Sequence, residues 1–150
     1  MNILITGASG YIGNFVVRQL LDDGHDVAVV SRFDNSFIKD FSDKVKVYFA
    51  DITKPFNFQL KDKHFDIFIH LAAANDIDSI NPECAINSSV LGTRYALDFC
   101  EKNRIEKVIY FSTFQVYGYL DGNMSEKSDL LPNNDYGITH LFAEQYFELY

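Results

Sequence analysis

The amino-terminal stretch constrains the fold of this chain more than any other feature, because an apolar run leads directly into three evenly spaced glycines. Residues 2–5 (NILI) are mostly apolar and partly β-branched, which is typical of a buried strand. Gly7, Gly10 and Gly13 follow, and a helical pattern begins among them. The first glycine permits a tight turn, the second lets an anion approach the backbone, and the third allows close packing of the helix. Because unpaired N–H groups at a helix start favour negative charge, we expect this loop to hold phosphate.

Three longer segments carry the periodicity of helices. The first follows the glycines, with Ile12, Phe15, Val16 and Leu20 at helical spacing before Gly24. The second opens with an Asn-Pro pair (residues 81–82), typical of an N-cap followed by proline in the first turn. That helix is expected to bury Ile86, Val90, Leu97 and Cys100 on one stripe. A third helix is predicted over residues 136–150.

Between these helices lie five short apolar segments that predict strands. They span residues 2–5, 26–30, 45–50, 65–74 and 107–112, with a polar turn at 34–36, a connector over 54–63 and an irregular loop from 113 to about 134. Continuous apolar strands that alternate with helices indicate a parallel sheet covered on both faces. Right-handed crossovers then predict an α/β, doubly wound sheet with strand order 3-2-1-4-5.

Composition limits the alternatives. The 150 residues are 47% hydrophobic, which suits one folded domain. A net charge of −8, with 13 basic residues scattered along the chain, argues against a nucleic-acid partner. Cys84 and Cys100 belong to no CxxC pair or Cys/His cluster, so we expect reduced core thiols and no metal site. We also expect no membrane span and a cytoplasmic location, since neither a signal peptide nor a long apolar run is present.

Small and polar residues gather at the expected carboxyl ends of the strands. They are Gly7 to Gly13, Ser31-Arg32, Asp51, Leu71–Ala73 and Ser112-Thr113. In a doubly wound sheet these ends share one edge, where ligands bind. Asn75, Asp76 and Asp78 follow the fourth strand; the sequence favours a solvated loop there, and contact with substrate is the alternative. The five strand ends together predict a dinucleotide crevice.

The end of the second strand bears on which dinucleotide is bound. An NAD site usually offers a carboxylate there to the ribose hydroxyls. This chain has Ser31 followed by Arg32, a pair that suits a 2′-phosphate. Arg32 on the adenine face or in solvent is the alternative. The sequence favours NADP over NAD.

These motifs resemble the extended short-chain dehydrogenase/reductase superfamily, in its NAD-dependent epimerase/dehydratase branch that acts on nucleotide sugars. The resemblance covers all 150 residues and rests on TGASGYIG (6–13), Asp51-Ile52, HLAAA (70–74), VLGT (90–93), STFQVYG (112–118) and YGITH (136–140). It implies an NAD(P)-binding Rossmann fold. It also implies that residues 1–150 form the dinucleotide-binding domain at the amino-terminal part of a longer enzyme, with the substrate domain absent from this chain.

The resemblance assigns roles to particular residues. Tyr136 would be the acid/base that moves a sugar hydroxyl proton during hydride transfer, and Thr113 would hydrogen-bond the same oxygen. Cofactor contacts would come from Gly7, Ser9, Gly10, Tyr11, Ile12, Gly13, Ser31, Arg32, Asp51, Ile52, Leu71, Ala72, Ala73, Ser89, Tyr136 and His140. Asp51-Ile52 matches the adenine contact, and Leu71–Ala73 matches the loop beside the nicotinamide ribose.

Two positions depart from the family pattern. The family has Tyr-x-x-x-Lys, whereas the lysine position here holds His140. A tyrosine with an ordinary pKa of about 10 needs a nearby positive charge to act as a base, and a histidine of pKa about 6.5 is mostly neutral at pH 7. His140 is therefore either a weaker substitute that hydrogen-bonds a ribose hydroxyl or the mark of a protein that binds without turnover. Ser89 stands where the family usually has asparagine, which weakens a bracing interaction.

Three functions follow from this resemblance. The first is an NAD(P)-dependent nucleotide-sugar epimerase, dehydratase or reductase. The second is a non-catalytic dinucleotide-binding or redox-sensing module. The third is an interaction protein that forms a homodimer through the aromatic carboxyl-terminal helix.

Overall fold

The fold is a five-stranded, all-parallel sheet with helices on both faces. The computed structural model describes residues 1–33, 36–41, 43–60, 63–118 and 122–150. Its strands lie in the order β3-β2-β1-β4-β5, which confirms the predicted doubly wound topology. The strands are β1 (Asn2–Thr6), β2 (Asp26–Ser31), β3 (Lys46–Phe49), β4 (Ile67–His70) and β5 (Lys107–Tyr110). The polar residues Asp34 and Asn35 of the predicted turn lie outside the described residues.

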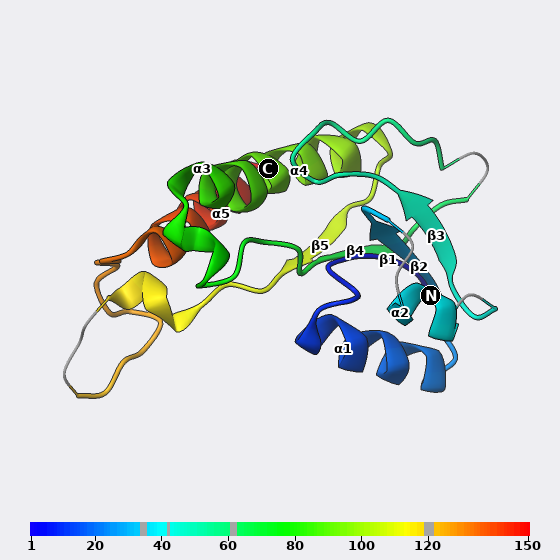
Figure 1. The fold of residues 1–150 in the computed structure, drawn as a ribbon, viewed down its shortest axis with the longest axis horizontal. Coiled ribbons are helices and arrows are strands. Elements are labelled where there is room, and N and C mark those ends of the chain that lie inside the picture. Colours follow the sequence, from blue (N-terminus) through cyan, green and yellow to red (C-terminus); the bar gives the residue numbers. More distant parts are fainter. Residues whose placement is uncertain (34–35, 42, 61–62, 119–121) are drawn as a thin grey trace.

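One group of helices covers each face of the sheet (Figure 1). On one face lie α1 (Tyr11–Asp22) and the short α2 (Ser36–Phe41). On the other, α3 (Pro82–Ala85) continues through a π-helical segment (Ile86–Leu91) into α4 (Gly92–Lys102). The last helix, α5 (Asp135–Leu149), packs against α3, the π-helical segment and α4. The carboxyl ends of the strands are thereby left between the two layers of helices.

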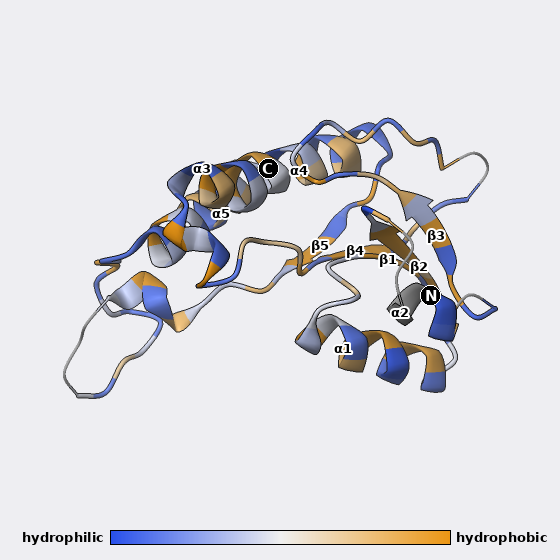
Figure 2. Cartoon of the chain, viewed as in Figure 1, coloured by the Kyte–Doolittle hydropathy of each residue, from blue (hydrophilic) through white to orange (hydrophobic). Residues whose placement is uncertain are grey.

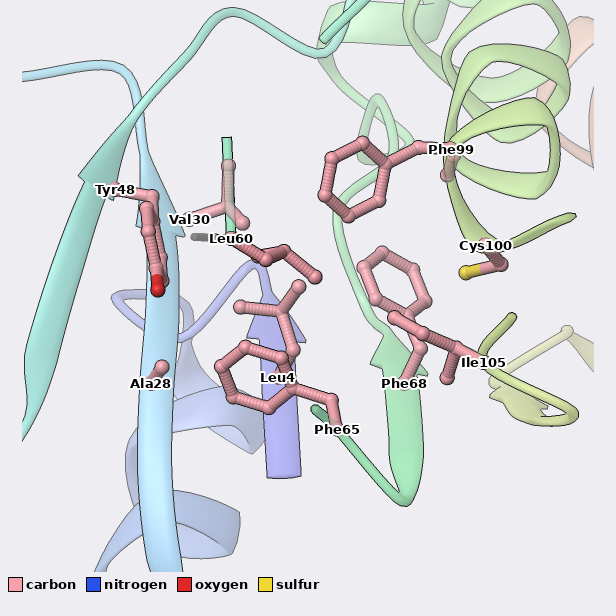
Figure 3. Packing of buried hydrophobic residues seen from close by; sticks show 11 residues of the cluster. Leu4, Ala28, Val30, Tyr48, Leu60, Phe65, Phe68, Phe99, Cys100 and Ile105 are labelled. Carbon is pink, nitrogen blue, oxygen red and sulfur yellow. The ribbon is translucent and has the colours of Figure 1, made fainter. Parts of the chain in front are cut away.

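Two apolar cores result from the alternation of side chains along the strands. Ile3 and Ile5 of β1 face α1, whereas Leu4 between them faces α4. The central strands are among the most hydrophobic parts of the chain (Figure 2). Figure 3 shows the core beneath α4, with members Leu4, Ala28, Val30, Tyr48, Leu60, Phe65, Phe68, Ala96, Phe99, Cys100 and Ile105. Burial on both faces explains why the strands read as continuous apolar runs.

The structure corrects one predicted helix face. In α1, where Ile12 and Phe15 were noted only at helical spacing, these two side chains are 52% and 61% exposed and Val17 is buried. Ile86, expected on the buried stripe of the second helix, is 48% exposed. The π-helical segment begins at Ile86, and its wider turn changes the phase of the helix, so Ile86 and the later residues of the predicted stripe do not share one face. Downstream of it, Leu97 and Cys100 are buried as predicted.

The predicted cap at Asn81 is confirmed, and three short elements were missed. The Asn81 side chain accepts hydrogen bonds from the backbone N–H groups of Glu83 and Cys84, with Pro82 in the first turn. The helix α2 occupies Ser36, which was predicted to lie in a turn. Two 3₁₀ turns, Asp78–Ile80 and Phe114–Tyr117, lie where loops were predicted. Such short elements depend on tertiary contacts more than on periodicity.

Cys84 and Cys100 are both unpaired thiols, as expected, but only Cys100 lies in the core; Cys84, also predicted there, is half-buried at the end of α3. Burial raises the pKa of Cys100 to about 12, so this thiol is unreactive at neutral pH. Among the helices of the described residues, none combines the length and apolarity needed to cross a membrane.

Candidate functional site

A crevice lies at the carboxyl edge of the sheet and encloses a cavity of about 640 Å³. The predicted residues Gly7, Ser9, Gly10, Tyr11, Ile12, Gly13, Ser31, Arg32, Ile52, Leu71, Ala72, Ala73, Tyr136 and His140 line it. Asp51, Ser89 and Thr113 are not among the lining residues. The structure therefore brings most of the predicted site residues together around one cavity.

The glycine loop is tight and closely packed. Gly7 has a φ of +73°, the left-handed region that favours glycine. A Cβ on Gly7 would lie 2.6 Å from the backbone nitrogen of Ala72, and one on Gly13 would lie 2.2 Å from the Gly7 carbonyl oxygen. Side chains at these two positions would push the loop away from β4 and from α1. The expected tight turn and close approach are both present.

The start of α1 can bind an anion. Gly10 is the N-cap residue, no side chain caps the first turn, and no acidic residue lies in it. The first N–H groups of a helix lack partners within the helix, and the helix dipole adds positive potential. The glycines and these N–H groups together fit the diphosphate of a dinucleotide.

The end of β2 presents an exposed guanidinium at the rim of the crevice. The Ser31 hydroxyl donates to the Phe33 carbonyl oxygen at 2.9 Å, which closes a short turn around Arg32. The Arg32 guanidinium carbon lies 5.4 Å from the centre of the Phe33 ring. The strand end itself carries Ser31 in place of a carboxylate, Asp34 follows in the sequence outside the described residues, and the Asp51 carboxylate lies close enough to Arg32 for their charges to interact.

Beyond β3, the Asp51 carboxylate is used within the protein. It accepts hydrogen bonds from the backbone N–H and the hydroxyl of Thr53, at 3.0 and 2.9 Å. The backbone bond from Thr53 is the main cause that lowers the pKa of Asp51, and the nearby Arg32 contributes. Ile52, the next residue, lines the crevice. The carboxylate thus shapes the turn that presents Ile52.

The loop after β4 is held by three hydrogen bonds from its own backbone. Leu71 N–H donates to the Thr6 carbonyl oxygen at 3.3 Å, and Ala72 N–H donates to the Thr6 hydroxyl oxygen at 3.3 Å. Ala74 N–H donates to the Ser89 hydroxyl oxygen at 3.2 Å. Ser89 is fully buried, so its contribution to the crevice is to brace this loop.

Tyr136 and His140 come from the first turns of α5. The Asn134 side chain accepts from the Gly137 N–H at 2.8 Å, which begins the helix and sets Tyr136 at the crevice wall. The two rings lie 4.3 Å apart, centre to centre, and His140 is only 3% exposed. Burial lowers the pKa of His140, although its bond to the Tyr136 carbonyl and the nearby Glu144 act in the opposite direction. His140 is therefore mainly neutral at pH 7.

The segment after β5 presents Ser112 to the crevice. The Ser112 hydroxyl donates to the Glu144 carboxylate on α5. The Thr113 hydroxyl oxygen instead accepts the Gln115 N–H at 3.2 Å and caps the 3₁₀ turn. Thr113 is part-buried beside the lining residues rather than among them.

Sequence reasoning missed part of the lining. The additional residues are Ala8, Val30, Phe33, Ala50, Ala74, Asn75, Asp78, Cys84, Ser88, Phe111 and Ser112. Of these, Ser112 was noted at a strand end, and Asn75 and Asp78 were expected in a solvated loop; both are exposed. The rule that ligands bind beyond strand ends could have found Ala50 and Phe111. No sequence signal marks Cys84 and Ser88, which reach the crevice through the packing of the helix. Within the described residues, no group of three or more metal-binding side chains occurs.

A doubly wound parallel sheet with a glycine loop and an uncapped helix start at its carboxyl edge defines a dinucleotide-binding domain of the Rossmann type. The profile of the NAD dependent epimerase/dehydratase family matches residues 3–150. The chain belongs to this family.

Individual relatives agree with the family match. The UDP-glucose 4-epimerase of Pisum sativum is 29% identical over 159 residues, which cover 95% of this chain and 45% of the relative. The solved structure of the UDP-Glc/GlcNAc 4-epimerase from Campylobacter jejuni is similar with a TM-score of 0.86 and 28% identity, covering 98% of this chain and 48% of that one. The UDP-glucuronic acid 4-epimerase from Bacillus cereus, solved with UDP-glucuronic acid and NAD, is similar with a TM-score of 0.85 and 26% identity, covering 99% and 52%. The chain thus spans about half the length of these relatives.

Proposed function

We propose that this chain is the dinucleotide-binding part of an NAD(P)-dependent enzyme that epimerises, dehydrates or reduces a nucleotide sugar. The observation that carries the proposal is the meeting of Tyr136 with the glycine loop around one cavity. Tyr136 lies 123 residues after Gly13, the last glycine of the loop. Family membership and the nucleotide-sugar enzymes among its relatives support the same reaction class.

Different residues of the crevice would bind different parts of the cofactor. The glycine loop and the first N–H groups of α1 would bind the diphosphate. Ile52 and the turn formed by Asp51 would lie against the adenine, and Leu71 to Ala73 would lie beside the nicotinamide ribose. When bound, the nicotinamide supplies the hydride acceptor and donor that the reaction needs.

Tyr136 would carry the acid–base chemistry. As the phenolate, its oxygen would take the proton of a sugar hydroxyl while hydride leaves the same carbon for the nicotinamide, and as the phenol it would return that proton when hydride comes back. Thr113 would hydrogen-bond the same sugar oxygen, and this role requires its hydroxyl to donate to substrate while the oxygen continues to accept from Gln115. Ser112, which lines the cavity, is the neighbouring hydroxyl that a substrate could meet first.

His140 would act as a neutral hydrogen-bonding group rather than as a cation. Its Nδ1 lies 2.8 Å from the Tyr136 carbonyl oxygen, which can only accept, so Nδ1 carries the proton of the neutral ring. Nε2 is then an acceptor for a ribose hydroxyl. The positive charge that a lysine would supply beside Tyr136 would be weaker here, and turnover would depend more on the charge of the oxidised nicotinamide.

For the choice of cofactor, we propose NADP ahead of NAD. Arg32 at the rim, and Ser31 rather than a carboxylate at the end of β2, support a 2′-phosphate contact. The NAD-bound relative supports a nicotinamide dinucleotide in general. Direct comparison of the two cofactors with an Arg32 variant decides between them.

The central test is Tyr136→Phe in the protein as its native gene expresses it. Turnover of nucleotide sugars should fall at least about a hundredfold, whereas NAD(P)H binding, followed by cofactor fluorescence, should change little. Tyr146→Phe, on the same helix but away from the crevice, is the matched control. Turnover that survives Tyr136→Phe would overturn the acid–base assignment.

A non-catalytic dinucleotide-binding or redox-sensing module is the second candidate. The buried, neutral state of His140 favours it, because the usual cation beside the tyrosine is absent. Such a module would bind NADPH or NADH and would turn over no nucleotide sugar in wild-type form. Detectable wild-type turnover rejects this candidate.

A further inference from the structure

Behind the crevice lies a cluster of polar side chains that the reaction does not use. Thr6, His70, Ser89 and Thr93 are all completely buried. Thr6 ends β1, His70 ends the adjacent β4, and the other two come from the helix that covers this face. A buried polar group is costly unless it is hydrogen-bonded, so a cluster of four in a core calls for an explanation.

The hydrogen bonds of the cluster run in one direction. The Thr93 hydroxyl donates its only proton to the Ser89 carbonyl oxygen at 2.6 Å, so its oxygen must accept from His70 Nε2 at 3.2 Å. With the Nε2 proton so used, Nδ1 of the neutral ring is an acceptor. The Thr6 hydroxyl, 2.7 Å away, donates to it.

This series of hydrogen bonds ends on the wall of the crevice. Because the Thr6 hydroxyl proton points to His70, its oxygen is free to accept the Ala72 N–H at 3.3 Å. Gly7, the residue after Thr6, packs so closely on Leu71 and Ala72 that a Cβ would lie 2.6 Å from backbone atoms of both. The two loops that line the crevice from β1 and β4 are thus joined at one point, and the buried hydrogen bonds set their spacing.

We propose that His70 is a positioning residue whose neutral ring, protonated on Nε2, joins Thr93 to Thr6 and thereby holds the Ala72 loop against the glycine loop. The proposal rests on the proposed function in one respect, because it takes these loops as the cofactor-binding walls. Reversing the His70 tautomer would place two acceptors, Nε2 and the Thr93 hydroxyl oxygen, against each other, and would leave the Thr6 hydroxyl proton without its acceptor on the ring.

The surroundings of His70 keep the ring neutral. Phe68 and Tyr110 stack on it, at 5.9 and 6.0 Å between ring centres. His140 is the titratable group that faces it from α5, and no carboxylate is among the groups that shift it. Burial first, and the charge of His140 second, lower the pKa of His70 to about 4. An imidazolium would donate from Nδ1 as well, and Thr6 could accept that bond only by turning its own hydroxyl proton away from His70.

The test compares Thr93→Val, which keeps the shape of the side chain and removes its hydroxyl, with Thr93→Ser, which keeps the hydroxyl. In wild type, the ring nitrogen chemical shifts of His70 should show a proton on Nε2 at pH 7. In Thr93→Val, hydrogen exchange of the Ala72 amide should speed up about tenfold, and NADH or NADPH binding should weaken by about the same factor. Thr93→Ser should restore both values.

The outcomes separate this inference from the proposed function. A proton on Nδ1 in wild type, or unchanged Ala72 exchange in folded Thr93→Val, overturns the positioning role. If wild type binds neither dinucleotide, the proposed function fails while the tautomer and exchange measurements still test the hydrogen-bond chain. If Thr93→Val does not fold, Thr6→Val against Thr6→Ser provides the same comparison from the other end.

Discussion

His140 Nδ1 lies 2.8 Å from the backbone carbonyl oxygen of Tyr136, one helical turn earlier on α5. This bond orients the imidazole beside the phenol ring and assigns the Nδ1 proton. It also explains how a histidine can occupy a lysine position without a full positive charge. The acid–base role proposed for Tyr136 can therefore be tested at position 140.

His140→Lys should raise turnover by about tenfold near pH 7 and broaden its pH profile, because a lysine supplies a lasting positive charge beside Tyr136. The pH dependence of kcat/KM in both proteins is the measurement. His140→Gln is the control, since it keeps a hydrogen-bonding group without charge and should behave like wild type at pH 7. Lower turnover in His140→Lys with intact cofactor binding would contradict a charge-limited reaction.

Arg32→Ala should weaken NADPH binding by about tenfold and leave NADH binding nearly unchanged, because a guanidinium paired with phosphate contributes about 1.5–3 kcal/mol at most and this one is exposed. Titration with both reduced cofactors measures the difference. Arg32→Lys retains the charge and should lie between wild type and Arg32→Ala. Equal losses for NADPH and NADH would remove the 2′-phosphate contact.

Gly13→Ala should destabilise the protein by about 3 kcal/mol, because the new Cβ would lie 2.2 Å from the Gly7 carbonyl oxygen and backbone must move. Urea unfolding gives the free energy. Gly24→Ala is the matched control: its φ is also positive, at +77°, yet nothing lies within 4 Å of the added carbon. That control should lose only about 1 kcal/mol. Similar losses at both sites would mean that the loop and α1 are less closely packed.

Acid should destabilise wild type more than His70→Gln. Burial lowers the pKa of His70 in the folded state to about 4, so below about pH 6.5 the unfolded chain binds a proton that the folded chain does not. Stability is therefore complete above about pH 6.5 and falls as the pH drops towards 4, by at most about 3 kcal/mol. Urea unfolding at pH 7 and pH 5 gives both values. Equal losses in the two proteins would contradict a neutral buried His70.

If the protein forms a dimer through α5, Phe142→Glu should convert it to monomer, because this side chain is 57% exposed on the helix. Sedimentation or light scattering measures the assembly state. Phe147 is unsuitable for this test, since its ring stacks on Tyr110 at 5.1 Å within the chain. Glu148→Gln, also exposed on α5, is the control. A monomeric wild type would end the proposal of a dimer.

Much of the crevice could be predicted because its signals are local. The glycine spacing at Gly7 and Gly13 requires only that a strand, a turn and a helix follow one another. The Asn81 cap likewise involves residues two and three positions away. The strand order followed from the right-handed crossovers of consecutive strands, and the topology confirms it.

Other features depend on neighbours that are distant in sequence. The exposure of Ile12 and Phe15, and the π-helical segment that begins at the exposed Ile86, reflect how each helix packs on the rest of the chain. The bonds that link Thr6 to His70 span 64 residues. No periodicity encodes such contacts.

The sequence by itself determined the parallel sheet, the phosphate-binding loop and the position of Tyr136 and His140 one turn apart, because hydrophobic period and local spacing decide these. Only the tertiary structure decided which polar groups face the cavity and which form hydrogen bonds within the protein. The Asp51 carboxylate accepts from Thr53, and the Ser89 hydroxyl oxygen accepts from Ala74 N–H. The tertiary structure also decided the protonation of His70 and His140, since burial and hydrogen-bond partners set the pKa of an imidazole and its residue type does not.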